Sequence, residues 1–473
     1  MTSQKDVRHF LNDNQEKFKD ISKFIFENPE TKFAEFISSD YLAKQCEEAG
    51  FTVERNVANM ETAFIATYGS GSPVIGFIGE YDALPGLNQE AFNLAYERSE
   101  KAGHACGHNL LGTGAFAAAC AVKKYLQENN LPGTVKYFGC PAEEGGSGKT
   151  FMVRDGLFNG VDAALTWHPS SVNGIMSLTS LAYCQVKFKF KGTSSHAAIS
   201  PELGRSALDA VEIMNVGANY LREHITSEAR MHYAVTDTGG VSPNVVQDTA
   251  EVLYMIRAPK STQVQHIYER VCKVAEGAAI MTETELSINF HNACSEYIPN
   301  RALEKILYNS LEKTETVEIT EADNDFAKDV WNTLTEAEQQ GYIQGMKGFG
   351  YTGDGSDLEG KYLTDFIAPY VESEEILFGS TDLSDVSWVV PTAKVTTATA
   401  AIGTALHTWQ MTAQGLSDFA NKGMLRAAEA LALTGIRLFE NEKALATVKQ
   451  EFDLFRKQNP YTCPIPDGVE PKN

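Results

Sequence analysis

The sequence predicts an α/β fold into which a smaller α+β domain is inserted. Apolar runs of strand length alternate with helical patterns over the first part of the chain, which is typical of a sheet covered by helices. Near residue 182 this pattern gives way to a strand with one polar face. A chain of 473 residues also exceeds the size of one ordinary hydrophobic core, so we expect more than one domain.

Four apolar runs in the first part have the length and composition of buried strands. They cover residues 63–68, 74–79, 135–139 and 163–167. Between the second and the third run, residues 109–127 place leucine, alanine and valine at helical spacing. Because continuous apolar strands that alternate with helices are typical of parallel sheets, we expect the four strands to run parallel.

Polar side chains directly follow three of these strands. They are Glu80 and Asp82, Glu143 and Glu144, and His168. In open α/β sheets the ligand crevice lies beyond the carboxyl ends of the strands. The sequence therefore predicts that these five residues converge in one cleft.

The inserted domain begins with a strand of a different kind. Within residues 183–191, apolar side chains alternate with lysines, which is typical of an antiparallel sheet with one face in solvent. Two helices and three further strands follow, at about 204–225, 262–279, 231–235, 250–256 and 285–290. We therefore expect an inserted α+β domain over residues 183–296, with residues 1–182 and 297–473 forming the catalytic domain in two parts.

The second part of the catalytic domain is expected to be mostly helical. Its last helices are expected at about 412–421, 422–439 and 442–457. Residues 348–360 are rich in glycine, aspartate and serine and predict a surface loop. The proline-rich tail, residues 460–473, is expected to fray.

Charge and cysteine content limit the partners and the compartment. The formal net charge is −22 and the pI about 4.9, which excludes nucleic acid and anionic membranes as partners because both need a basic patch. No targeting segment or membrane-spanning apolar run is visible. The eight scattered cysteines form no close Cys-x-x-Cys pair, which predicts reduced thiols in a cytoplasmic protein.

Cys106 and His108 lie in a glycine-flanked loop just before a predicted helix. With Asn109 as the N-cap, the helix N-terminus would lower the pKa of the Cys106 thiol and favour the thiolate. Thiolate and imidazole are ligands of divalent transition metals. The loop is therefore a candidate metal site.

Glu143 and Glu144 are candidates for two different roles. Adjacent side chains on an extended segment point in opposite directions, so we expect one carboxylate to bind metal and the other to transfer protons. A Glu-Glu pair in isolation is more often a solvated surface. Its position at the end of a buried strand favours the functional interpretation.

Three histidines complete the candidates. His168 follows the fourth strand and is a candidate ligand. His407, taken singly, is more often structural, and only the number of ligands that two metals need favours it. His196 lies on a turn in the inserted domain, where a histidine is commonly just exposed. Together, the clusters predict a metal-dependent hydrolase.

The ordered motifs resemble the amidohydrolase branch of the co-catalytic metallopeptidases related to aminoacylase. The branch's Asp-Ala-Leu-Pro, Cys-Gly-His, Glu-Glu, His-Pro and late histidine correspond to residues 82–85, 106–108, 143–144, 168–169 and 407. Within the branch, residues 79–86 and 380–388 are similar to the group that hydrolyses p-aminobenzoyl-glutamate. Glu80 and Asn109 depart from the wider branch, which has aspartate at both positions.

The resemblance implies a zinc-peptidase-like catalytic domain, with helices on both faces of a mixed sheet, and two divalent ions. Mn²⁺ or Zn²⁺ are the expected metals, with Co²⁺ as a further candidate. The implied ligands are the bridging Cys106 and a set of four further residues, His108, Glu144, His168 and His407. Glu143 would be the general base, and Asp82 would belong to the catalytic set.

The resemblance also implies a role for the inserted domain as a lid that forms a homodimer. His196 would reach the active site of the neighbouring subunit. Asn244 and Arg257 match residues that hold the carboxylate of an N-acyl amino acid substrate.

Two rival functions stay open. An aminoacylase or a dipeptidase acting on unusual dipeptides would share the site and differ only in the acyl pocket. A non-catalytic partner subunit could keep the same fold, and a catalytic chain could itself need a homologous second subunit. Release of glutamate from an aromatic amide would distinguish a p-aminobenzoyl-glutamate hydrolase from an aminoacylase or a dipeptidase. Absence of bound metal would favour a non-catalytic partner subunit.

Overall fold

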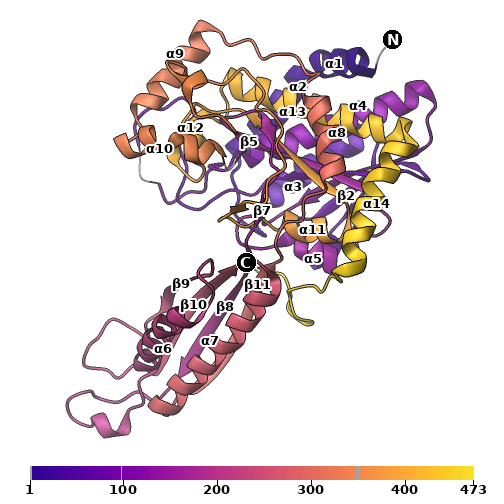
Figure 1. Ribbon diagram of the computed structural model, residues 1–473. Helices are drawn as coiled ribbons and strands as arrows, with labels where there is room; N and C mark the ends of the chain where they lie inside the picture. Colours follow the sequence, from indigo (N-terminus) through magenta and orange to yellow (C-terminus); the bar gives the residue numbers. More distant parts are fainter. Residues whose placement is uncertain (1–2, 97–98, 348, 350, 473) are drawn as a thin grey trace.

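The computed structural model describes residues 3–96, 99–347, 349 and 351–472. A large mixed sheet is surrounded by helices, and a separate antiparallel sheet projects from this body (Figure 1). The predicted fold class is thereby confirmed.

The large sheet has seven strands in the order β1-β2-β4-β3-β5-β13-β6. Their bounds are β1 (Thr52–Arg55), β2 (Phe64–Ser70), β3 (Val74–Glu80), β4 (Gly133–Cys140), β5 (Ala163–Ser170), β6 (Gly174–Ile175) and β13 (Thr392–Ala398). The strands β4, β3, β5 and β13 run parallel, whereas β1, β2 and β6 pair antiparallel. The carboxyl ends of the parallel strands therefore meet at one edge.

The prediction that the first apolar run is a parallel strand is wrong. That run becomes β2, which pairs antiparallel with β4. Only residues 71–73 separate β2 from β3, whereas a parallel crossover needs a dozen or more residues. The chain must therefore reverse direction between these two strands.

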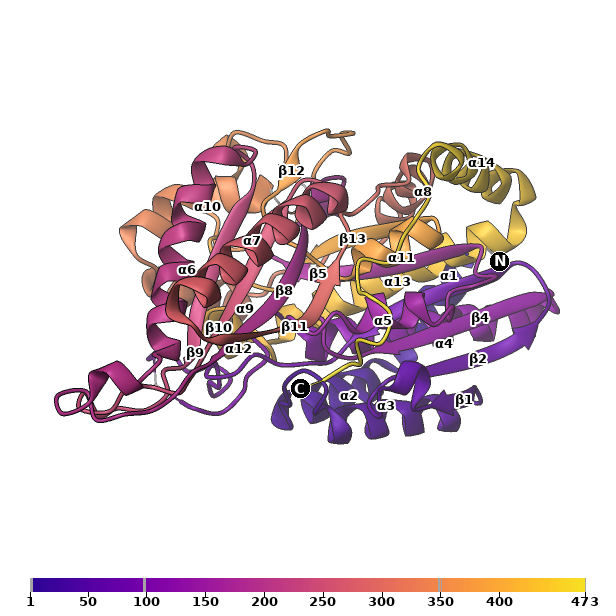
Figure 2. The same ribbon diagram turned by 90° about the horizontal axis from the view of Figure 1, so that it is seen from below.

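Helices cover both faces of the large sheet (Figure 2). They are α1 (Ser3–Asp13), α2 (Gln15–Glu27), α3 (Phe36–Glu48), α4 (His108–Asn129), α5 (Gly148–Arg154), α8 (Arg301–Leu311), α9 (Glu321–Asn332), α10 (Glu336–Lys347), α11 (Leu383–Val389), α12 (Trp409–Gln414), α13 (Asp418–Glu440) and α14 (Glu442–Gln458). On one face α4 and α13 pack against each other and share a core with Phe77 and Leu165. On the other face α5 and α11 pack together, in a core that includes Ile78 and Phe138.

Strand β13 is an element that the sequence patterns do not indicate. Its residues Thr-Ala-Lys-Val-Thr-Thr-Ala form no long apolar run, yet every one of them is buried. The threonine hydroxyls are satisfied internally, because Thr396 donates to the carbonyl of Phe349 and Thr397 to that of Gly423. A polar sequence can thus form a central strand when its hydroxyls find partners.

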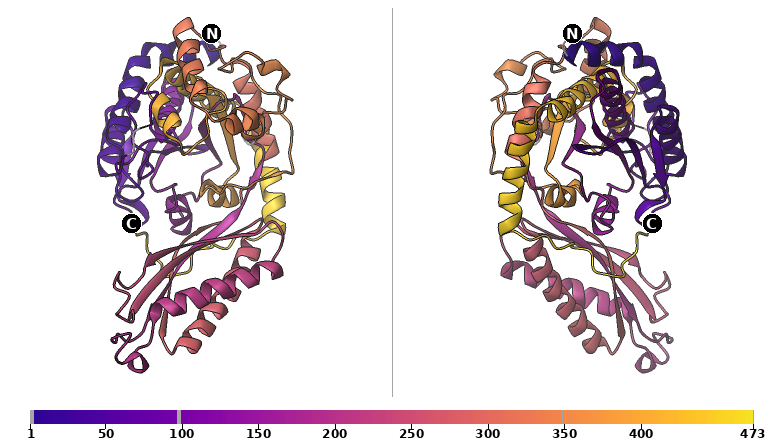
Figure 3. Two further views of the ribbon diagram at one scale, coloured as in Figure 1. Left: turned by 90° about the vertical axis from the view of Figure 1, so that its left-hand side faces the viewer. Right: turned by 90° about the vertical axis from the view of Figure 1, so that its right-hand side faces the viewer.

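The second sheet has the order β11-β8-β10-β9 and is antiparallel throughout. Its elements are β8 (Ala182–Lys191), α6 (Ala207–Leu221), β9 (Arg230–Asp237), β10 (Thr249–Ala258), α7 (Ser261–Thr282) and β11 (Glu285–Cys294). Both helices lie on the side of the sheet that points away from the larger domain (Figure 3). Val186, Phe188 and Phe190 are buried, as the alternating pattern predicts.

Several details of the C-terminal part differ from expectation. Gly348 and Gly350 of the predicted surface loop lie outside the described residues, but Tyr351 and Leu358 are buried. The predicted helix break near residue 421 lies instead between α12 and α13. The tail is packed rather than frayed, since the hydroxyl of Tyr461 donates to Asp385. Among the described residues no helix is long and apolar enough to cross a membrane.

Candidate active site

A cavity of about 290 Å³ opens at the carboxyl ends of the parallel strands. The predicted residues that line it are Glu80, Cys106, Glu143, Glu144, His168 and His407. They come from β3, the loop before α4, the end of β4, β5 and the segment after β13. The structure thus brings together residues that are up to 327 positions apart.

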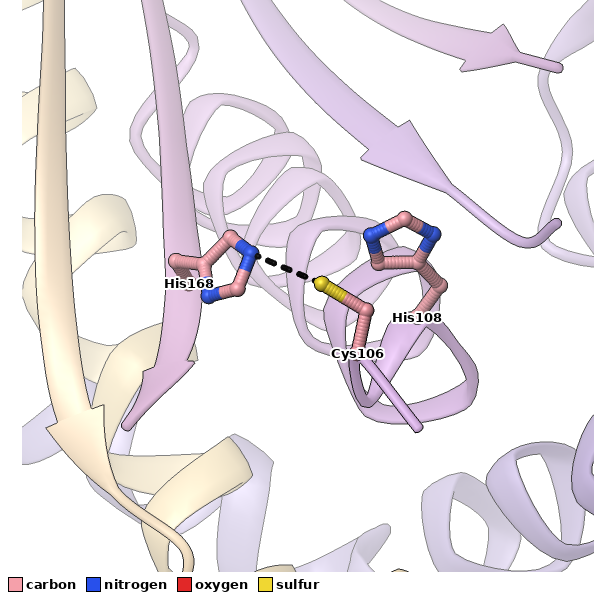
Figure 4. A group of neighbouring side chains, drawn as sticks. All are labelled: Cys106, His108 and His168. Atoms are coloured by element: carbon pink, nitrogen blue, oxygen red, sulfur yellow. Dashed lines mark hydrogen bonds between the residues drawn. The ribbon is translucent and has the colours of Figure 1, made fainter. Parts of the chain in front are cut away.

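Cys106, His108 and His168 form one group of potential ligands (Figure 4). The Cys106 Sγ lies 3.5 Å from the Nε2 of His168. One ligand atom from each of the three residues lies within 4.8 Å of the others. A single cation could therefore contact all three side chains.

Cys106 also belongs to a second group, with Glu144 and His407. The Nε2 of His407 lies 3.1 Å from the Oε1 of Glu144. His407 adopts a φ of 62°, and its backbone N–H donates to the carbonyl of Ala105 at 2.9 Å, which holds it beside the cysteine loop. A thiol shared by two groups has the position expected of a bridging ligand.

Asp82 positions two of these residues and does not line the cavity. Its Oδ1 lies 2.9 Å from the Nδ1 of His108, and its Oδ2 accepts a hydrogen bond of 2.8 Å from the backbone N–H of Glu144. The Nδ1 of His108 is thereby engaged, which leaves Nε2 to face the site. Fixing the second nitrogen of a ligating histidine in this way is common in metal sites.

The donor set fits a divalent transition metal. The His108 Nε2 and the Glu144 Oε1 are both buried and make no well-aligned hydrogen bond among the described residues, although Glu80 lies 3.3 Å from the first and His407 3.1 Å from the second. Unsatisfied buried polar atoms are costly, and a coordinated cation would satisfy both. One thiol, three imidazoles and one carboxylate are ligands that zinc, manganese and cobalt accept.

The cap of α4 differs from the prediction. Helix α4 begins at His108 and its N-cap is Gly107, at a φ of 74°. Asn109 lies inside the first turn, where its amide donates to Ser22 and to the carbonyl of Gly415. Asn109 therefore braces the loop instead of capping the helix.

The predicted lowering of the Cys106 pKa is also wrong for the protein by itself. Burial raises the pKa of this thiol, and the nearby charge of Glu144 raises it further. These effects outweigh the opposing influence of His108 and His407. Cys106 is fully enclosed among site residues, where removal from water disfavours the thiolate.

Glu143 and Glu144 do not lie on an extended segment. Residues 143–146 form a turn, so both carboxylates line the same cavity. Burial, followed by the charges of Glu80 and Glu144, raises the pKa of Glu143 well above its usual range. A half-buried carboxyl group that faces the cavity is placed to accept a proton and to return it.

The site also contains a buried lysine that no sequence pattern indicates. Lys149 is fully buried, and its ammonium lies 2.8 Å from Glu80 and also pairs with Asp382. Burial would raise the pKa of Glu80, but the charges of Lys149 and His108 overcome this and lower it to about 2. Glu80 is thus held as a carboxylate beside His108.

The predicted residues of the inserted domain lie in two different places. His196 and Asn244 are exposed in loops at the end of the sheet farthest from the larger domain, and neither lines the cavity. Arg257 lies at the near end, where its guanidinium donates to the Ser380 hydroxyl at 2.8 Å. Since Ser380 lines the cavity, Arg257 lies directly behind its wall.

Comparisons with known proteins agree with this geometry. The sequence model of peptidase family M20/M25/M40 matches residues 76–360. One of the subunits of p-aminobenzoyl-glutamate hydrolase from Escherichia coli (strain K12) is 48% identical, over 98% of this chain and 99% of the relative. The Xaa-Arg dipeptidase of Mus musculus is 28% identical, over 93% of this chain and 90% of the relative.

The fold also matches a solved structure. A dinuclear metal-binding peptidase of the M20 family from Bacillus subtilis superimposes with a TM-score of 0.54 and 17% identity, covering 91% of this chain and 99% of that one. At this identity the likeness shows the fold. It places the same two-sheet architecture in a protein that is described as binding two metals.

Proposed function

We propose that this chain, which belongs to peptidase family M20/M25/M40, hydrolyses the amide bond of p-aminobenzoyl-glutamate to p-aminobenzoate and glutamate. The observation that carries the proposal is the cavity in which Cys106 faces two groups of ligands beside Glu143. A relative that is 48% identical over almost the whole chain supports the choice of substrate.

The proposal includes two divalent ions, Mn²⁺ or Zn²⁺, with Co²⁺ as a further candidate. Cys106 would bridge them, and the other protein ligands would be His108, Glu144, His168 and His407. Ions held there would polarise the amide carbonyl and the attacking water. The Nε2 of His108 and the Oε1 of Glu144, which are buried without a well-aligned hydrogen bond, support this assignment.

Glu143 carries the proton transfers in this proposal. As general base it takes a proton from the water whose oxygen adds to the amide carbon, and it then delivers that proton to the leaving nitrogen. One water is consumed, the C–N bond breaks, and the carboxylic acid and the amine leave. Its position in the cavity, beside the proposed ligand Glu144, supports both steps.

The inserted domain is proposed to act as a lid within a homodimer. His196 and Asn244 lie at the far end of the four-stranded sheet β11-β8-β10-β9, here called the lid sheet, and do not line the cavity of their own chain. This position supports a role in the partner's active site. Arg257 lies beside the cavity of its own chain and is proposed to hold a substrate carboxylate. The proposed lid comprises residues 183–296.

We place the enzyme in a reducing compartment, the cytoplasm. All eight cysteines are free, and the site itself depends on a reduced thiol at Cys106. Disulfides are rare in such compartments.

The alternative in the same class is a dipeptidase or an aminoacylase, which the mouse Xaa-Arg dipeptidase represents. A non-catalytic partner subunit is the alternative of another class. The complete ligand set and the presence of Glu143 favour a catalytic chain over that second alternative.

The test is a panel of amides offered to the metal-loaded enzyme. Release of glutamate from p-aminobenzoyl-glutamate should clearly exceed amino-acid release from acetyl, benzoyl and dipeptide amides. Preference for a dipeptide or an aliphatic amide would move the function to the first alternative. Absence of turnover on every amide, with metal demonstrably bound, would contradict a self-sufficient catalytic chain.

A further inference from the structure

Lys394 is a second buried lysine at the active site, and the proposed mechanism does not use it. It lies on β13, where it pairs with Thr166 of β5 in the register of the sheet. Only 7% of the residue is exposed, and it lines the same cavity as Glu143 and His168. A charged side chain at this depth needs an explanation.

The charge of Lys394 is not paired in the way that the charge of Lys149 is. Within the part of the chain that the structure describes, the ammonium of Lys394 has neither a carboxylate within 4.0 Å nor a hydrogen-bond acceptor, whereas Lys149 is paired with two carboxylates. Burial lowers the pKa of Lys394, opposed by the charges of Glu80 and Glu143. Lys394 lines the cavity without an ion pair of its own, so an anion bound in the cavity could pair with its ammonium.

The walls near Lys394 are suited to a polar anionic group. Thr179, Ser180, Ser380 and Thr381 line the same cavity. The hydroxyls of Ser380 and Thr381 accept hydrogen bonds from Arg257 and from the backbone N–H of Leu383, which leaves their own protons to donate. Arg257 donates to Ser380, so a second cation borders the cavity from the lid side. Glu80, Glu143 and Glu144 also line the cavity, so the two cations mark the places where carboxylates of a substrate can be paired.

An adjoining hollow extends this positive character toward solvent. It is lined by Arg230, His232, Arg257, Phe378 and Gly379, and Gly379 also lines the catalytic cavity. An anionic substrate that enters past this hollow would meet Arg257 first. Lys394 lies on the large sheet, away from this entrance.

We propose that Lys394 binds a second carboxylate of the substrate and thereby makes the enzyme selective for amides that carry two carboxylates. The inference rests on the proposed function and adds a specificity-determining residue to it. The second carboxylate can be the side chain of the released amino acid, as in glutamate, or a group on the acyl part. Both sources supply the same partner for the ammonium.

The first experiment compares matched amides in the wild type and in Lys394→Met. N-acetylglutamate is paired with N-acetylglutamine. N-succinylalanine is paired with the analogue in which the free carboxylate of the succinyl group is an amide, so that each pair differs in one carboxylate. The variant should lose roughly 10- to 100-fold in kcat/KM on the carboxylate member of one pair, mainly through KM, because a hydrogen bond to a charged group is removed. The amide member should lose much less, so that the preference for the carboxylate member of the pair falls.

The pair that responds identifies the source of the carboxylate. A loss on the glutamate pair places the amino-acid side chain at Lys394, and a loss on the succinyl pair places the acyl group there. An equal fall in kcat on all four amides would overturn the proposal, because Lys394 would then act on the reacting bond. Unchanged kinetics on all four would overturn it as well.

A binding measurement keeps the inference testable if no amide is turned over. Calorimetry on the metal-loaded protein should show tighter binding of glutarate than of its monoamide, and Lys394→Met should remove the difference. Absence of turnover together with this result would reject the proposed function and keep the Lys394 site. Equal binding of both compounds by the wild type would reject the site.

Two further variants serve as controls. Lys136→Met removes a lysine from the neighbouring region of β4, where the ammonium lies over the Phe138 ring outside the cavity, and should change neither measurement. Lys394→Met breaks no ion pair and should fold. If it does not, Lys394→Gln tests the same loss of charge with a polar side chain.

Discussion

At the residue scale, the site depends on one cysteine that faces two groups of ligands. Cys106 lies within 4.8 Å of ligand atoms from His108 and His168 on one side, and from Glu144 and His407 on the other. Removing a shared ligand should weaken both metal positions, whereas removing a ligand of one group should affect mainly that group.

The first prediction concerns Cys106→Ala. We expect it to lose both metals and all amidase activity, because the shared thiolate is the only donor common to the two groups. Metal content per chain, measured by mass spectrometry after dialysis, checks this. Cys272→Ala, which changes a half-buried cysteine outside the site, is the matched control. Two metals retained per chain in Cys106→Ala would contradict the bridging role.

The second prediction separates catalysis from metal binding. Glu143→Gln should keep two metals but lower kcat by roughly 100- to 10,000-fold, because the amide cannot accept the proton from water. The same metal analysis and steady-state kinetics are sufficient. A variant that keeps wild-type kcat would show that Glu143 is not the base.

The candidate ligands could be predicted because each lies in a local pattern at the end of an element. Lys149 and Lys394 could not, because a single lysine among glycine, serine and threonine residues has no pattern that reveals its partners. The partner Asp382 is 233 residues from Lys149 in the sequence. Burial and pairing at that separation become visible only in the folded chain.

At the element scale, a single glycine sets the geometry of the cysteine loop. Gly107 caps α4 at a φ of 74°, between the ligands Cys106 and His108. A Cβ at this position would lie 2.9 Å from a ring carbon of Pro169, the residue after His168. Both the backbone conformation and the packing therefore exclude a side chain here.

The third prediction follows from this. Gly107→Ala should destabilise the protein by at least about 1 kcal/mol and weaken metal binding, because the left-handed conformation is strained for alanine. Gly277→Ala is the matched control, since this glycine lies inside α7 with open space around it and should gain stability. Thermal unfolding midpoints of both variants provide the measurement. Equal midpoints for the two variants would show that the left-handed conformation of Gly107 does not contribute to stability.

Strand prediction was reliable where apolar runs are continuous and failed in two informative places. The direction of β2 depends on a three-residue connection, which apolar periodicity does not report. Strand β13 is concealed by threonines whose hydroxyls are satisfied across the sheet. Both errors concern pairing with distant segments and not local propensity.

At the scale of the whole molecule, the two sheets place site residues far apart. The lid sheet carries Arg257 at its near end and His196 with Asn244 at its far end. The sequence indicates an inserted domain but not which end of it faces the cavity. Arg257 can therefore act within its own chain, whereas the roles proposed for His196 and Asn244 need a partner subunit.

The fourth prediction tests this arrangement by subunit exchange. Glu143→Ala and His196→Ala should each be inactive as separate dimers. Mixed dimers contain one complete site, with Glu143 from one chain and His196 from the other. With random exchange, half of the dimers are mixed and one of their two sites is complete, so about a quarter of wild-type activity should return. No recovery after demonstrated exchange would contradict the proposed role of His196.

The central claim is that the cluster around Cys106 holds the metals that support amide hydrolysis. The most direct measurement is glutamate release from p-aminobenzoyl-glutamate while metal-free protein is titrated with Mn²⁺ or Zn²⁺. We expect no release without metal, an increase that saturates when two ions are bound per chain, and no release at any metal concentration for Cys106→Ala. Full activity of the metal-free protein, or of Cys106→Ala, would contradict it.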